Sequence, residues 1–351
     1  MTLASISTSY LNSALLPSVR QAQSQLANLQ VESTTGEYAD LGQQLGVQSG
    51  YEMSLRTQDD LLQTMTTANG ITATNLSSAQ SALTTIQSAA QSAASGLLSW
   101  NADSASSISL QSYGQSQLQQ LQTLANTSGA DGYLFSGQNS AVQPFNDFYS
   151  QPTSAARTAI DNAFQTNFGF SITSPQVANI TAKDMDDFLA GPFAAQFENS
   201  NWTDNWSSAS SVNSSAQISP GTTADTTSTI NTSGFQKLAQ GYAMLSELGG
   251  IGLSSSAQQA VASTAITVIN QGSTAITAQA AQIGVTQSNI TQADDDMQGQ
   301  MQVLQTQLGR SDNVDQATIA TELTTLTDQL QVAYQLTAKI NSMNLAQYLP
   351  A

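Results

Sequence analysis

The sequence predicts a mainly α-helical protein: a long helical hairpin or bundle with paired N- and C-terminal coiled-coil helices and a central α+β or β-rich insert domain. Apolar residues recur at steps of three and four near both ends of the chain, which is typical of coiled-coil helices. Residues 51 to 125 contain no proline and are rich in Ala, Leu, Gln and Ser, as expected of long helices. The middle differs in kind, because five of the seven prolines lie between residues 140 and 233.

The N-terminal segment, residues 1 to 33, is expected to form one helix of a coiled coil. Its apolar residues follow steps of 4, 3, 4 and 3 and are Leu15, Val19, Ala22, Leu26 and Leu29. This spacing places them on one helix face. Residues 33 to 50 then bring four glycines and lose the periodicity, so we expect a loop with short turns there.

Residues 51 to 125 are expected to form two antiparallel helices, divided near the segment SWNADSA at residues 99 to 105. Glycines at 129 and 132 predict a turn after the second helix. A short apolar strand is predicted at residues 133 to 135.

The insert, residues 140 to 234, is expected to be compact and partly β. The segment NFGFSITS at residues 167 to 174 alternates like a strand, and residues 206 to 233 are rich in Ser and Thr with strand and turn character. Trp202 and Trp206 stand four residues apart, which favours an anchor for the insert core. A sugar-binding platform is the alternative for this pair.

Helices return at residues 235 to 308, interrupted at LGGIGLSSS, and the last helix is expected to begin near Asp315. The apolar residues on one side of this last helix are Ile319, Leu323, Leu326, Leu330, Ala333 and Ile340. Further apolar residues widen that surface: Val332, Leu336, Met343 and Leu345. A single partner helix cannot cover so wide a surface, so we predict that neighbouring subunits cover the rest. An intramolecular bundle, with the same residues as core, is the alternative.

These segments predict four parts. They are an N-terminal helix at residues 1–33, a helical rod at 34–139 and 235–310, a variable outer insert at 140–234, and a C-terminal helix at 311–351.

Charge and composition exclude several function classes. The 24 acidic and 7 basic residues give a formal charge of -17, which disfavours binding to nucleic acid or to anionic lipid. Only 9% of residues are charged, so Ser, Thr, Gln and Asn must form most of the polar surface. Such side chains are cheaper to bury than charges when they are hydrogen-bonded, which suits a subunit of an assembly. A secreted protein of low charge is the alternative.

Catalytic, cofactor and metal sites are not expected. Cysteine and histidine are absent, which removes disulfides, thiol nucleophiles and the commonest general base. The run Asp294 to Asp296 is interpreted as a solvated helix face. No apolar run reaches the length of a membrane span, and the N-terminus lacks the pattern of a cleaved signal peptide.

Three stretches resemble a known family. AYQLTAKINSMNLAQYL at residues 333–349 is similar to the terminal segment that flagellins and hook–filament junction proteins share. LANTSGADGYLFSG at 124–137 resembles a segment of the junction proteins and is the more discriminating match. ESTTGEYADLGQQLG at 32–46 stands in place of a Ser-Thr-Gly loop but lacks the Arg and Ser-Asp-Asp-Pro-like run that usually follow.

The sequence therefore resembles the flagellin superfamily and, within it, the hook–filament junction proteins, also called third hook-associated proteins. The resemblance covers residues 1 to 140 and 235 to 351. It implies a non-enzymatic structural subunit that the flagellar secretion apparatus exports without a cleaved signal, and that lies outside the cell at the junction. The implied partners are copies of itself in a ring or helix, a neighbouring hook-associated protein, flagellin, and the export machinery with a chaperone. Nucleic acid and membrane insertion are not implied.

The residues predicted to carry this role form two groups. The predicted assembly interface consists of Leu15, Val19, Leu26, Leu29, Ile319, Leu323, Leu326, Leu330, Leu336, Ile340 and Leu345. The predicted structural loop motif consists of Gly129, Gly132, Tyr133, Phe135 and Gly137. The alternatives are flagellin itself, a signalling coiled coil of the chemoreceptor type, and an enzyme with paired carboxylates, although no such pair can be placed.

Overall fold

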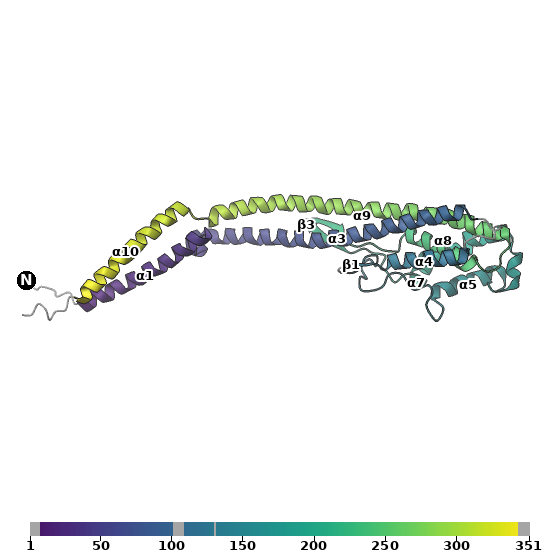
Figure 1. Ribbon diagram of the computed structural model, residues 1–351, viewed down its shortest axis with the longest axis horizontal. Helices are drawn as coiled ribbons and strands as arrows, with labels where there is room; N and C mark the ends of the chain where they lie inside the picture. The colour runs from purple at the N-terminus through teal and green to yellow at the C-terminus, as the bar shows by residue number, and fades with distance from the viewer. Residues whose placement is uncertain (1–7, 101–108, 130, 343–351) are drawn as a thin grey trace, which may run out of the picture. The chain divides into compact units, whose positions relative to one another are not determined.

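The computed structural model describes residues 8–100, 109–129 and 131–342, and describes side chains between residues 16 and 339 of these ranges (Figure 1). Its α-helices are α1 (Thr8–Thr35), α2 (Leu41–Leu45), α3 (Ser49–Leu98), α4 (Leu110–Ala125), α5 (Ala155–Phe168), α6 (Ala182–Phe188), α7 (Asn199–Asn205), α8 (Ser233–Leu248), α9 (Ser255–Asp312) and α10 (Gln316–Ser342). Shorter helical turns are Gly46–Gln48, Pro175–Asn179, Leu189–Phe193 and Ala194–Phe197. The strands are β1 (Ser128–Gly129), β2 (Gly132–Tyr133), β3 (Ser215–Ser219) and β4 (Thr222–Asp225).

The chain divides into two compact units. The terminal unit consists of Met1–Gln63 with Gln298–Ala351, and the central unit consists of Thr64–Met297. The predicted mainly α-helical class with paired terminal helices is confirmed, whereas the four-part division of the chain stays a prediction.

In the terminal unit α1 packs along α10. The side-chain amide of Gln23 donates a 2.7 Å hydrogen bond to the Tyr334 hydroxyl across the pair. The last helix begins next to Asp315, as predicted. The Asp315 carboxylate caps it by accepting hydrogen bonds from the Ala317 amide at 2.9 Å and the Thr318 hydroxyl at 3.1 Å. These hydrogen bonds, the one from the Ala317 amide first, lower the pKa of Asp315.

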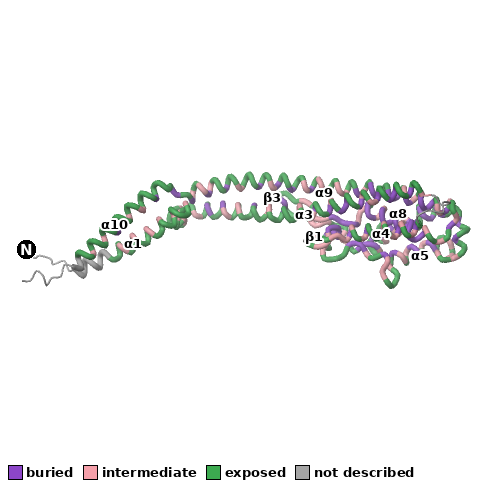
Figure 2. The backbone as a smooth tube through the Cα atoms, in the orientation of Figure 1, coloured by how far each residue is buried: buried purple, intermediate pink, exposed green. Residues whose placement is uncertain are grey.

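The central unit is built around α8, which is buried along nearly its whole length (Figure 2). Helix α4 packs against it so closely that a Cβ on Gly114 would lie 2.4 Å from the Ser246 amide nitrogen. Helix α9 approaches its other side, where a Cβ on Gly241 would lie 2.5 Å from the Ile269 side chain. Glycines therefore set the helix spacing, since any side chain at these contacts would push the backbones apart.

The insert core is a cluster of aromatic rings, and Trp202 and Trp206 lie at its centre. Both are at most 1% exposed, and their rings stack at 6.0 Å between centroids. Their indole nitrogens donate to Asn231 at 2.8 Å and to the Gln196 carbonyl at 3.1 Å. The rings around them are Phe145, Phe148, Phe164, Phe188, Phe193 and Phe197. The two tryptophans thus anchor the core, and the sugar-platform alternative is wrong because neither ring face is open.

One predicted strand is absent from the described residues and another is shortened, and the insert is α+β rather than β-rich. Residues 167 to 174 end α5 and form bends, because Gly169 caps the helix at a φ of 76°. The apolar residues alternate there because their rings pack together. The ring centroid of Phe168 lies 4.7 Å from that of Phe164 and 6.1 Å from that of Phe170. The predicted strand at 133–135 is shortened to β2, which pairs with β1 in a hairpin. The Ser/Thr-rich stretch does form the expected hairpin, β3 with β4.

This β3–β4 hairpin is tied to the long helices of the central unit by a buried amide. The Asn69 side chain on α3 donates to the Ile218 carbonyl at 2.7 Å and to the Asp294 carboxylate of α9 at 2.6 Å. Asp294 therefore has a structural partner, while Asp295 and Asp296 are exposed as predicted.

An ion pair between a half-buried arginine and a buried glutamate joins the insert to α8. The Arg157 guanidinium lies 2.9 Å from the Glu247 carboxylate, which also accepts the Ser246 hydroxyl at 3.0 Å. Burial raises the pKa of Tyr149, which is hydrogen-bonded to Ser246, to about 12. Burial, and then the negative charge of Glu247, raise the pKa of Asp161 nearby. Polar groups in this interface are therefore connected rather than isolated.

We expect Gly114→Ala to destabilise the central unit by about 1–3 kcal/mol, because the added methyl would overlap the α8 backbone. Gly70→Ala on α3 is the matched control: nothing lies within 4 Å of its Cβ, and alanine is the better helix former by up to about 1 kcal/mol. All three tryptophans lie in this unit, so thermal unfolding followed by tryptophan fluorescence measures it. Equal midpoints for the two variants would contradict the close approach.

Candidate assembly interface

The predicted seam residues lie at the contact between α1 and α10. Ile319 and Leu330 are each 5% exposed. The half-buried seam residues are Val19, Leu26, Leu29, Leu323 and Leu326. The side chains of Leu15, Ile340 and Leu345 lie outside the described residues. The heptad spacing thus brings together the seam residues whose side chains are described, except Leu336, which is 47% exposed.

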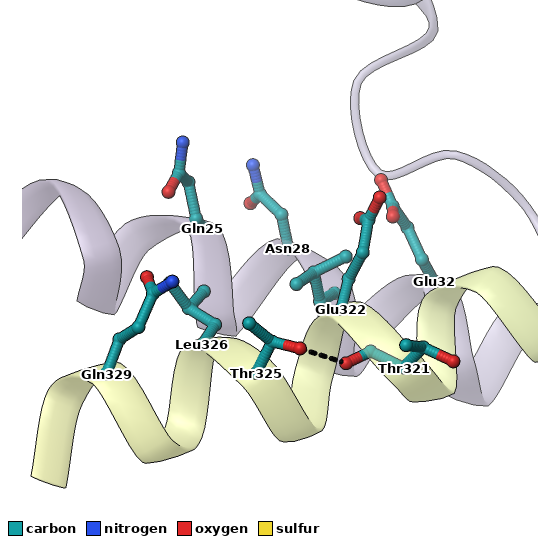
Figure 3. A pocket seen from close by; sticks show the side chains of 9 residues that line it. Gln25, Asn28, Glu32, Thr321, Glu322, Thr325, Leu326 and Gln329 are labelled. Atoms are coloured by element: carbon teal, nitrogen blue, oxygen red, sulfur yellow. Dashed lines mark hydrogen bonds between the residues drawn. The ribbon is translucent and has the colours of Figure 1, made fainter.

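A groove of about 420 Å³ follows one side of this pair (Figure 3). Its apolar floor is Leu29 and Leu326, and its polar lining residues are Gln25, Asn28, Glu32, Thr321, Glu322, Thr325 and Gln329. In Figure 3 the side chains of Gln25 and Asn28 rise from α1, and that of Glu322 rises from α10. The groove is therefore an apolar seam bordered mainly by uncharged hydrogen-bonding groups.

A second groove of about 570 Å³ lies along the same pair. It is lined by Gln23, Leu26, Ala27, Gln30, Thr327, Leu330, Gln331, Tyr334 and Gln335. By helical periodicity these residues occupy the opposite face of each helix from the first groove. The two helices thus leave open apolar surface on both sides of their contact.

Further large side chains with apolar surface on these helices are exposed. Val332, Tyr334 and Leu336 on α10 are 62%, 51% and 47% exposed. Leu16 and Val31 on α1 are 54% and 49% exposed. Repeated exposure of large apolar groups on one helix pair is what we expect of a surface that another protein covers.

The isolated pair is weakly held. Among the described side chains of α1 and α10, only Ile319 and Leu330 are buried (Figure 2). Fully burying such a side chain contributes roughly 1.5–3 kcal/mol, whereas ordering each residue costs about 1–2 kcal/mol. Two buried side chains cannot offset that cost over two helices of 28 and 27 residues, even with their backbone hydrogen bonds. We therefore expect contacts with neighbouring molecules to supply much of the remainder.

The predicted loop motif sets the path from α4 into the insert. Gly132 has a φ of 118°, and a Cβ there would lie 2.3 Å from the Ser140 carbonyl oxygen. Gly137 has a φ of 61°, and a Cβ there would lie 2.5 Å from the Ser210 carbonyl oxygen. Both positions therefore require glycine, for left-handed backbone and for close approach.

The other motif residues fill or border the same turn. Phe135 is fully buried, with its ring 5.5 Å from that of Phe235 on α8. Tyr133 is half-buried. A Cβ on Gly129 would lie 2.5 Å from the Asn75 side chain.

Asn126 follows α4 directly and fixes the next chain segment. Its side chain accepts the Phe145 amide at 2.8 Å and donates to the Phe145 carbonyl at 3.0 Å. This two-way contact holds the aromatic cluster against the end of α4. Together with the motif glycines, Asn126 therefore fixes where the chain enters the insert.

Other kinds of site were searched for in the part of the chain that the structure describes. It contains no cluster of three or more acidic side chains placed to hold a metal ion. Nor does any described helix have the length and apolarity needed to span a bilayer.

Comparison with protein families identifies this architecture. The sequence matches the bacterial flagellin N-terminal helical region over residues 6–140 and the bacterial flagellin C-terminal helical region over residues 266–349. Together these matches span more than half of the chain. The chain belongs to the flagellin superfamily. A comparison with curated proteins finds no significant match.

The protein is accordingly a structural subunit of the bacterial flagellum. Its family self-assembles into flagellar polymers and is exported to the flagellum outside the cell. The α1/α10 pair falls within the two matched regions.

The sequence analysis missed part of this surface. Tyr334 lies inside the terminal resemblance but was not singled out, although it bonds Gln23 and lines the second groove. Leu16 and Val31 were missed because they lie off the heptad seam. One sequence signal could have indicated this surface. Gln, Asn and Thr stand beside the seam, where coiled coils usually carry charged residues.

We expect Val332→Asp and Leu330→Asp to block assembly by different routes. Leu330 is buried within the pair, so the charge should separate α1 from α10 and lower the helicity of the monomer. Val332 is exposed, so its variant should keep wild-type circular dichroism and fail only when a neighbouring molecule must cover it. Immunoblot of sheared appendages measures incorporation into flagella, which both variants should lose, and circular dichroism of the monomer separates the two routes. Normal assembly of Val332→Asp would exclude that surface.

Limited trypsin digestion tests the weakness of the isolated pair. The sequence has only seven Lys and Arg residues, and Arg20 on α1 and Lys339 on α10 are exposed. We expect monomer to be cut at these two sites before Lys183, which is also exposed, on α6 of the central unit. Mass spectrometry of the fragments gives the order. Cleavage at Lys183 first, in demonstrated monomer, would mean that the pair is stable alone.

Proposed function

We propose that this flagellar subunit joins the hook to the filament. The observation that carries the proposal is the segment LANTSGADGYLFSG at residues 124–137, which resembles the junction proteins. In this chain the segment has specific structural work: Asn126, Gly132 and Gly137 fix the path into the insert. A motif with such demands on residue type supports the proposal more strongly than terminal helices do, because flagellins have those helices too.

The layout of the terminal unit supports an adaptor. A junction subunit must meet two different polymers, a hook-associated protein on one side and flagellin on the other. The α1/α10 pair offers two grooves on opposite faces, bordered mainly by Gln, Asn and Thr. Uncharged hydrogen-bonding side chains can be buried against either partner without stranding an unpaired charge. Export would proceed through the flagellar secretion apparatus with a chaperone.

The alternative is flagellin, the filament subunit. It is favoured by one specific observation, namely that both matched regions are named for bacterial flagellin. The two functions differ in where the subunit lies and how many copies each flagellum holds.

Deletion of the gene distinguishes the two functions. For a junction subunit, hooks should form and flagellin should still be exported, but flagellin would leak into the medium because no template receives it. For a flagellin, the filament protein itself should disappear and nothing should leak. The measurement is an immunoblot of culture supernatant for flagellin, beside electron micrographs of the cells.

Complementation provides the control. The full chain supplied in trans should restore filaments, whereas residues 1–318 should not, because α10 is then missing. Immunogold labelling of isolated flagella should mark only the filament base. Label along the whole filament, or normal filaments in the deletion strain without a second gene copy, would reject the junction proposal.

A further inference from the structure

Two connecting segments of the terminal unit run side by side between the helices. They are the first connector, residues 36–40 between α1 and α2, and the second connector, residues 313–315 between α9 and α10. An antiparallel bridge pairs Glu37 with Asn313. The Tyr38 amide donates to the Asp312 carbonyl at 3.0 Å, and the Val314 amide donates to the Gly36 carbonyl at 2.9 Å. Two backbone hydrogen bonds thus fix the register between the two halves of the chain.

Arg56 on α3 lies at this bridge and contacts both halves. Its Nη2 donates to the Asp312 Oδ2 at 2.6 Å, across 256 positions of sequence, and its Nε donates to Glu52 one turn away. Asp312 is 4% exposed and Glu52 is 7% exposed. A buried carboxylate without a cation is costly, so Arg56 makes the burial of both acids tolerable.

The charges at this point are unbalanced. Glu37, Glu52 and Asp312 act on one cation, Arg56. The second carboxylate oxygen of Asp312 is buried without a hydrogen-bond partner among the described residues. Removing the arginine would leave three acids close together, and the two connectors would repel each other.

We propose that Arg56 is the positioning residue that holds the two connectors in register, so that α1 and α10 enter the assembly as a pair. Its positive charge compensates the buried carboxylates of Asp312, beside the bridge, and of Glu52 on α3. The consequence for assembly rests on the flagellar role of the chain, whereas the effect on the connectors can be measured in the monomer.

The pH dependence of a variant follows from the same charges. Burial raises the pKa of Asp312, Arg56 opposes that shift, and Glu52 and Glu37 add to it. A carboxyl whose pKa is higher in the folded state binds protons more readily when folded, so acidification stabilises the fold through it. In Arg56→Gln the opposing guanidinium is gone and the pKa of Asp312 rises further. The damage should therefore be largest at neutral pH and should diminish as pH falls.

Hydrogen exchange of the full-length monomer tests the proposal at the two bridging amides. In Arg56→Gln, peptides that contain Tyr38 and Val314 should exchange about tenfold faster than in wild type at neutral pH. Adding Asp312→Asn should restore slow exchange, because the uncompensated charge is then removed. Arg56→Lys, which keeps the charge, should lie close to wild type. The increase should shrink when exchange, corrected for its intrinsic pH dependence, is measured at about pH 5.

Arg157→Gln is the matched control, since it removes a comparably exposed arginine from the buried Glu247 of the central unit. It should leave both amides unchanged. In cells, exported Arg56→Gln should incorporate poorly into flagella, and the double variant should recover. Wild-type exchange in Arg56→Gln, or no recovery with Asp312→Asn, would overturn the positioning role. Faster exchange with normal incorporation would overturn its consequence for assembly.

Discussion

The terminal unit depends on burial that one chain cannot complete. Helices α1 and α10 carry an apolar seam, yet Ile319 and Leu330 are the only buried side chains among those described on the pair. The rest of the seam borders two open grooves, and Val332 and Leu336 are exposed. A helix pair of this kind gains stability when neighbours cover it, so we expect the folding of these helices to be coupled to assembly. The small share of charged residues favours assembly, because few ionic groups must lose water when subunits meet.

The central unit follows the opposite strategy. Helix α8 is buried along nearly its whole length, and glycines such as Gly114 and Gly241 allow α4 and α9 to approach it closely. The insert adds a continuous aromatic core around Trp202 and Trp206. Each part therefore completes its own burial within one chain. A subunit with a self-sufficient middle and incomplete ends can be exported and then joined to others through those ends.

Much of the fold could be predicted from local sequence, and the exceptions have physical causes. The start of α10 was predictable because Asp315 follows a break in periodicity and can cap the helix. The strand expected at residues 167 to 174 does not form: Phe164 and Phe168 lie one helical turn apart, and Gly169 then turns Phe170 into the same cluster. Alternating apolar residues can thus result from a helix end followed by a turn, which periodicity alone cannot distinguish from a strand.

The candidate interface was predictable in type but not in register. Heptad spacing places Leu330 and Leu336 on the same broad apolar surface, and only the relative position of α1 decides that Leu330 is covered while Leu336 is exposed. Arg56 carried no local signal, because its partner Asp312 lies 256 positions away.

The few basic residues of this chain matter most where they pair with buried acids. With 7 cations against 24 acids, most carboxylates must face solvent, and a buried one requires a dedicated partner. Two arginines serve buried acids across long sequence separations: Arg56 serves Asp312 in the terminal unit, and Arg157 serves Glu247 in the central unit. An apolar contact tolerates small sliding, whereas a buried ion pair is favourable only in one arrangement. The helices of this protein are rich in Ala, Leu, Gln and Ser, so many helix registers are nearly equivalent, and we expect each pair to favour one arrangement in its own unit. In the terminal unit the seam then provides the adhesion, and the Arg56–Asp312 pair favours the register in which the seam residues meet.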